Sequence, residues 1–123
     1  MANKDLYIEY MKDKHGWRVT YDGGVYQPNP SANKNTDTVT WHAPRDMDVC
    51  IVFLPDSPFE LEDGQRDVLT IKAGESSPAF KFKDGCSNYR VYEYAALVTD
   101  PEVPGDYTYV RGAESPPGVA VGP

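Results

Sequence analysis

The side chains best suited to chemistry in this chain are two histidines and two cysteines, and their order limits what they can do. His15 and His42 both precede Cys50 and Cys86, and the sequence contains no H-x-H, H-x-x-x-H or C-x-x-C pattern. A metal site in a protein needs three or four donors at suitable spacing. The acidic residues also lack the D-x-D-x-D-G spacing of a calcium loop. We therefore expect no bound metal and no cofactor, and we interpret both histidines as structural.

The two cysteines differ in their sequence surroundings. Cys50 lies inside an apolar run and is expected to be a small core residue, whereas Cys86 follows the turn signal at residues 84–85 and is the more exposed thiol. A reactive thiolate needs a cationic neighbour and some exposure. Pairing of Cys86 with His42 would define a small thiol-dependent enzyme, and a Cys50–Cys86 disulfide would require an oxidising compartment. We expect free thiols and a protein that is not an enzyme, with no catalytic residues.

Tyrosine is the most unusual feature of the composition, with nine Tyr against four Phe and two Trp. On the expected strand at residues 89–98, Tyr92 and Tyr94 share one face and Tyr89 lies on the other. Tyr107 and Tyr109 share a face of the next strand. An exposed row of tyrosines would suit a carbohydrate-binding module, which is the alternative function. Packing between neighbouring strands on a half-buried sheet is the commoner use of such a pattern.

The elements that must position these residues are short strands. Apolar and polar residues alternate in several short stretches separated by Gly, Pro, Asn and Asp, and no window of eleven or more residues has helical periodicity. Residues 12–16 and 28–35 read as a polar turn and a surface loop, and Phe59 is expected to fold back as a plug. This pattern predicts one domain over residues 1–123, an all-β, two-sheet Greek-key sandwich of eight or nine short strands. The expected strands are residues 6–10, 17–21, 36–42, 48–54, 67–72, 79–83, 89–98, 107–111 and 119–121.

The charge balance excludes several classes of partner. Nineteen acidic and twelve basic side chains give a net charge of −7. Nucleic acid and anionic membrane surfaces would repel such a protein, so neither is an expected partner. No apolar stretch follows Met1 as a secretory signal would require, so we expect a cytoplasmic location unless a leader has been removed.

Three segments, read in order, resemble the cupredoxin family. Residues 37–41 match the family's D-x-V-x-W/F strand, residues 50–53 its H-x-I/V-x-F strand, and residues 105–110 its G-x-Y-x-F strand. The run at residues 69–75 matches the I-x-x-G-E feature between them. The resemblance implies a cupredoxin-like sandwich covering most of residues 36–121.

The residues that would bind copper in this family are absent. Its sites use a His from the middle segment and then Cys, His and usually Met near the last strand. The middle position is Val49 here, and Arg111 and Glu114 stand near the later ones. In a second alignment, residues 95–105 are an insertion and Ala95 and Ala96 occupy the Cys position. Because both histidines precede both cysteines, neither alignment can supply a Cys followed by a His, and we expect a copper-free scaffold.

The resemblance also implies where a binding surface would lie. The two loops at the former metal end span residues 42–48 and 111–117, and their charged and imidazole side chains could receive a polar group. We therefore expect a non-catalytic binding or protein-interaction module whose partner is an unknown protein or a small polar ligand. Unpaired edge strands leave self-association into a homo-oligomer open. The candidate interaction residues are His42, Arg45, Asp46, Arg111 and Glu114.

Overall fold

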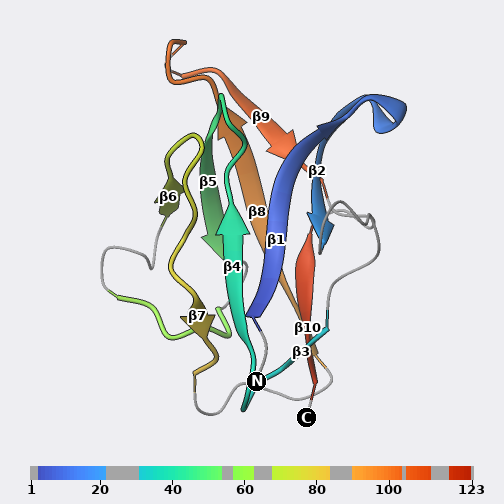
Figure 1. The fold of residues 1–123 in the computed structure, drawn as a ribbon, viewed down its shortest axis with the longest axis vertical. Helices are drawn as coiled ribbons and strands as arrows, with labels where there is room; N and C mark the ends of the chain where they lie inside the picture. Colours follow the sequence, from blue (N-terminus) through green and yellow to red (C-terminus); the bar gives the residue numbers. More distant parts are fainter. Residues whose placement is uncertain are drawn as a thin grey trace.

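Strands with alternating apolar residues form two sheets that pack face to face (Figure 1). The computed structural model describes residues 3–21, 31–53, 57–62, 68–83, 90–103, 105–111 and 117–122. The expected all-β, two-sheet sandwich is confirmed. The one helix in these ranges is the short 3-10 turn η1 (Lys12–Lys14), and no described helix has the length and apolar character to cross a membrane. The strands are β1 (Asn3–Met11), β2 (Gly16–Tyr21), β3 (Ser31–Asn33), β4 (Thr38–His42), β5 (Asp48–Phe53), β6 (Leu69–Ile71), β7 (Phe80–Lys81), β8 (Arg90–Thr99), β9 (Tyr107–Val110) and β10 (Gly118–Gly122).

The first sheet has the strand order β2-β1-β4-β7 and contains the long β1–β2 hairpin. The hairpin is antiparallel from Leu6↔Tyr21 to Met11↔Gly16, and η1 closes it. On its other edge β1 pairs in parallel with β4, from Asn3↔Thr38 to Tyr7↔His42. This sheet is therefore mixed, and its central strand β1 is longer than β4.

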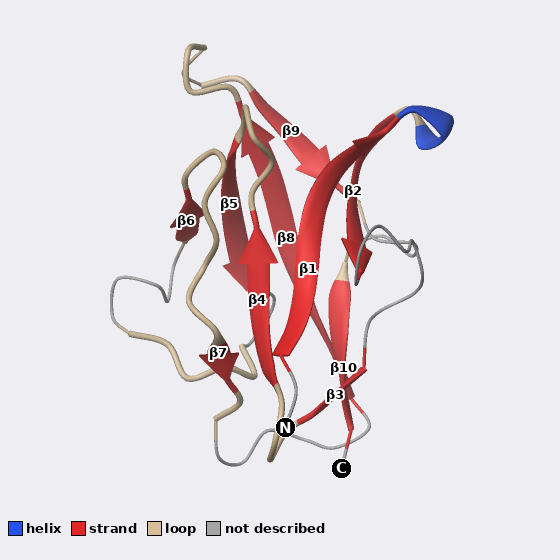
Figure 2. Ribbon diagram, viewed as in Figure 1, coloured by secondary structure: helices blue, strands red, loops and turns tan. Residues whose placement is uncertain are grey.

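The second sheet has the order β3-β10-β8-β5-β6, and β9 also pairs with β8. Strand β8 is long enough to hold two partners along one edge, because β10 pairs with its first half and β9 with residues 96–99. Strand β5 pairs with the other edge. In Figure 2 the β4–β5 and β8–β9 connections both lie at the upper end of the sandwich.

Aromatic side chains fill the centre between the sheets. Trp41 of β4 is fully buried and makes edge contacts with Phe59, Phe80 and Tyr94, whose ring centroids lie 5.4, 5.8 and 5.5 Å from its own. Phe59 also contacts Phe82 at 4.9 Å, so the expected plug is confirmed. This cluster ties β4, β7 and β8 together across the sandwich.

The expectation of a surface loop at residues 28–35 is wrong in part. Residues 31–33 form β3, although the surrounding segment has a loop-like composition. The open edge of β10 supplies a parallel partner, and Ala32 is buried beneath it. Residues 48–53 form β5, but Cys50 and Val52 on its outer side are only partly buried. The apolar run therefore buries one face fully, through Val49 and Ile51, and the other face only in part. Leu54 and the turn expected at residues 84–85 lie outside the described residues.

Candidate functional site

The candidate site is a groove formed where β4 ends beside β1. The parallel ladder between these strands stops at Tyr7↔His42, whereas β1 continues to Met11 with β2 as its partner. In Figure 1 the arrow of β4 ends partway along β1, and β1 then bends away toward the upper right. The sheet therefore opens at this point.

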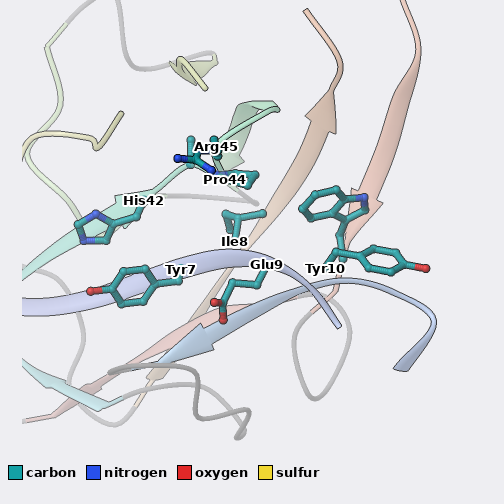
Figure 3. Close-up of a pocket in the computed structure, with 9 residues that line it drawn as sticks. Tyr7, Ile8, Glu9, Tyr10, His42, Pro44 and Arg45 are labelled. Atoms are coloured by element: carbon teal, nitrogen blue, oxygen red, sulfur yellow. The ribbon is translucent and has the colours of Figure 1, made fainter. Parts of the chain in front are cut away.

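The groove has a volume of about 440 Å³. One wall is the segment after β4 and the floor is β1. In the close-up, Ile8 points to the side on which Pro44 and Arg45 lie, and Glu9 points the opposite way (Figure 3). The lining residues are Tyr7, Ile8, Glu9, Tyr10, Trp17, His42, Ala43, Pro44 and Arg45.

An aromatic pair forms one end of the groove. Tyr10 of β1 and Trp17 of β2 are cross-strand partners, with ring centroids 5.5 Å apart and an interplanar angle of 70°. Trp17 packs partly against the core, but Tyr10 is 54% exposed. A half-exposed aromatic pair offers apolar contact area to a ligand at little cost in side-chain entropy.

The wall formed by the segment after β4 is held in place by backbone hydrogen bonds, and it carries a positively charged side chain. The Ala43 amide donates to the Glu75 carbonyl at 2.9 Å, and the Gly74 amide donates to the Pro44 carbonyl at 2.8 Å. These bonds fix the chain on which Arg45 stands. The Arg45 side chain is exposed and has no ion pair among the described residues. Its guanidinium is therefore available to a ligand.

His42 stands at the edge of the groove in a fixed orientation. Its Nε2 lies 2.8 Å from Asp5 Oδ1, and its Nδ1 lies 2.6 Å from Ser76 Oγ. The Tyr7 ring stacks on the imidazole with centroids 4.5 Å apart. Because a carboxylate only accepts hydrogen bonds, the neutral tautomer that satisfies both contacts carries its proton on Nε2 and accepts from the Ser76 hydroxyl.

The order Asp5–His42–Ser76 is the order of groups that activates a serine nucleophile. Ser76 is not one of the residues that line the groove, so a ligand bound there lies beside His42 and not against the serine hydroxyl. The contacts to Asp5 and Ser76 hold both ring nitrogens of His42. The arrangement therefore fixes the imidazole and joins β1, β4 and the segment that contains Ser76.

The structure separates the residues expected to form the interaction surface. His42 and Arg45 line the groove together, and Asp46 is exposed in the same connection. Arg111 lies beside β2, where its backbone bonds to Trp17 and Val19. It is not one of the residues that line the groove. Glu114 lies outside the described residues.

The cysteines and tyrosines that the sequence singled out also lie in different parts of the structure. Cys50 is a free thiol on the outer side of β5 and is only partly buried, so its expected place in the core is wrong. Cys86 and Tyr89 lie outside the described residues. Tyr92 and Tyr94 are buried between the sheets, whereas Tyr107 and Tyr109 are 54% and 70% exposed.

Sequence reasoning missed most of the groove. The sequence pattern predicts Tyr7, Tyr10 and Trp17 only as members of strands. It predicts no binding or catalytic site that includes Asp5 or Ser76. The sequence contains one local indication of the aromatic pair: a hairpin around the polar turn at residues 12–16 places Tyr10 opposite Trp17. The pairing of β1 with β4 joins residues 35 positions apart and has no comparable local signal.

The described residues contain no group of three or more His, Cys, Asp or Glu side chains placed to hold a metal ion. No protein-family model, no curated protein and no solved structure matches this chain.

Proposed function

We propose that this chain is a non-catalytic binding module that recognises a partner in the groove between β1 and the β4–β5 connection. The observation that carries the proposal is the placement around one groove of the Arg45 guanidinium, which has no ion pair among the described residues, and of the Tyr10–Trp17 pair, in which Tyr10 is exposed and Trp17 half-buried. A few polar groups beside aromatic contact area are the usual composition of a binding site. The partner is a protein segment or a small molecule with a polar group.

We assign the scaffold to a copper-free, cupredoxin-like type. The segments that carry the resemblance overlap β4, β5, β6 and β9. Val49, at the position where the family has a histidine, has an aliphatic side chain without a donor atom and is fully buried in the apolar core. Metal analysis of the purified protein tests this assignment, and stoichiometric copper would contradict it.

The chemistry of the groove indicates the groups that a ligand should carry. A guanidinium binds a carboxylate through two parallel hydrogen bonds. An aromatic pair favours an apolar or aromatic group. With a net charge of −7, the protein as a whole does not attract an acidic ligand at long range. Recognition would therefore depend on the local contact with Arg45 and would weaken with added salt.

A binding screen with groove variants tests the proposal. Immobilised protein is screened against a peptide library and a glycan array, and each hit is measured again with Arg45→Ala and Tyr10→Ala. A charge-assisted hydrogen bond contributes about 1.5–3 kcal/mol, so Arg45→Ala should weaken binding tenfold or more. Lys81→Ala, an exposed change on β7, is the matched control. Hits that bind all three variants as tightly as the unmodified protein would refute the groove as the site.

The absence of catalysis is tested separately at Ser76 and at the cysteines. A fluorophosphonate probe should not label Ser76, and the protein should not accelerate hydrolysis of p-nitrophenyl acetate beyond the rate of a Ser76→Ala variant. Alkylation of the thiols should leave binding intact. Labelling of Ser76 or loss of a measured activity on alkylation would overturn the non-catalytic assignment.

Carbohydrate binding is the second candidate, and one observation favours it. Tyr107 and Tyr109 lie two positions apart on β9, so both rings project from the same face, and both are exposed. Tyr92 and Tyr94 take no part because they are buried. Hits on the glycan array that are lost with Tyr109→Ala but kept with Arg45→Ala would favour this face over the groove.

A further inference from the structure

The floor of the groove is the open edge of a strand. Strand β1 continues for four residues, from Ile8 to Met11, beyond its last pair with β4 at Tyr7↔His42. Over the same residues its other edge remains paired with β2. At about 3.3 Å per residue, this open edge is about 13 Å long.

The backbone direction of β2 follows from its bonds to Arg111. The Arg111 amide donates to the Trp17 carbonyl at 3.1 Å, and the Val19 amide donates to the Arg111 carbonyl at 3.0 Å. The backbone groups of Trp17 and Val19 therefore point away from β1. Since backbone direction alternates along a strand, those of Arg18 between them point toward β1.

The same alternation fixes the direction of β1. Arg18 is paired with Glu9, so the backbone groups of Glu9 face β2. The N–H and C=O of Tyr10, the next residue, then face the opposite edge and the groove. No backbone or side-chain partner for these two groups occurs among the described residues. They form a ready donor and acceptor for an added strand.

We propose that an extended peptide segment of a partner protein adds to β1 at this edge and bonds to the Tyr10 backbone. This inference rests on the proposed function and names the class of partner. Strand addition gives affinity through backbone hydrogen bonds, and side chains that meet flanking pockets give specificity. About four residues of extended peptide match the open length of β1.

The side chains around the edge indicate the composition of the peptide. Arg45 lies on the side to which Ile8 points and has no ion pair within the described part of the chain, so it selects an Asp or Glu (Figure 3). The Tyr10–Trp17 pair selects an apolar or aromatic side chain. Because residues two apart on a strand share a face, the acidic and aromatic residues should be separated by one position. A second copy of this chain is a poorer occupant, since two molecules of charge −7 repel each other.

Amide hydrogen exchange of the free and bound protein tests the strand addition directly. In the free protein the Tyr10 amide should exchange faster than the Glu9 amide, because only the latter faces β2. The probe is a synthetic library of octapeptides that carry an Asp or Glu and a Tyr or Trp two positions apart, in either order, in a background of Thr and Val. A bound peptide should slow exchange of Tyr10 tenfold or more and leave Glu9 unchanged. Binding without added protection at Tyr10 would overturn the inference.

Backbone methylation of the best peptide provides a matched pair of ligands. N-methylation of the peptide amide that faces β1 should weaken binding tenfold or more, whereas methylation of the adjacent amide should change it less than twofold. Equal effects at both positions would show that side chains alone carry recognition, which contradicts strand addition.

The failures of the two proposals are distinguishable. If the glycan array gives Arg45-dependent hits and the peptide library gives none, the groove is a binding site and the peptide inference is wrong. If neither library gives Arg45-dependent binding, both are wrong. Arg45→Ala should weaken peptide binding tenfold or more, and Lys81→Ala should leave it unchanged.

Discussion

Replacing Tyr94 by Phe should make the protein more stable. The Tyr94 ring is almost completely buried and packs against Trp41, and neither the phenol oxygen nor the Trp41 indole nitrogen has a hydrogen-bond partner among the described residues. An unpaired buried polar group costs about 1–3 kcal/mol relative to its hydrated state. Tyr94→Phe removes that cost and keeps the ring, at the price of a small void where the oxygen was. We expect a net gain of about 1 kcal/mol.

Urea unfolding measures this gain. The midpoint should rise while the slope stays constant, since the change does not alter the surface exposed on unfolding. A gain of 1 kcal/mol should raise the melting temperature by about 4 °C for a chain of this size. Tyr107→Phe, at an exposed position, is the control and should change stability by less than about 0.5 kcal/mol. A loss of more than 1 kcal/mol in Tyr94→Phe would show that the hydroxyl has a partner, such as an ordered water, and would refute the reasoning.

The same residue predicts a loss of stability in alkali. Burial raises the pKa of Tyr94 far above the ordinary value near 10. Above about pH 10 the unfolded chain loses this proton and the folded chain keeps it, so folding stability falls as pH rises. The slope from this one group is about 1.4 kcal/mol per pH unit. Tyr94→Phe should lack that component, and parallel pH profiles of the two proteins would contradict the assignment.

The remaining predictions concern packing and backbone conformation, and urea unfolding measures each of them. Phe59→Ala should cost about 3–5 kcal/mol, because it leaves a cavity beside Trp41. The control Val68→Ala, at an exposed position, should cost less than about 0.5 kcal/mol. Similar losses in the two variants would mean that Phe59 does not pack as described. His15 has a left-handed backbone with φ of 54°, so His15→Gly should stabilise by about 0.5–1 kcal/mol, and a loss would argue against that conformation. Gly74 has φ of 75°, and an added Cβ would meet the Arg45 carbonyl oxygen at 3.8 Å, an ordinary contact distance. Gly74→Ala should therefore cost about 1–2 kcal/mol through backbone strain alone, and a neutral effect would exclude that strain.

The sequence by itself predicted the class of fold and most of the strands, because alternation of apolar residues is a local property. The alternating residues 79–83 place Phe80 and Phe82 inward, and the apolar run at 48–53 places Val49 and Ile51 in the core. Local pattern was insufficient at β3, where three residues of loop-like composition become a strand only because β10 offers an edge. It was also insufficient at Cys50, because an apolar run does not show which of its faces another layer covers.

The candidate groove was decided by tertiary structure. The sequence singled out His42 and Arg45 as candidates, but it could not bring them beside Tyr10 and Trp17. Their meeting depends on where the parallel β1–β4 ladder stops, and that register joins segments 35 residues apart. Registers between distant strands are set by the packing of the whole core, so a local pattern carries little information about them. For this protein the sequence determined which residues could form strands and which side chains carried charge. Only the tertiary structure decided that β1 extends beyond the end of β4 and leaves an open strand edge between Arg45 and the Tyr10–Trp17 pair.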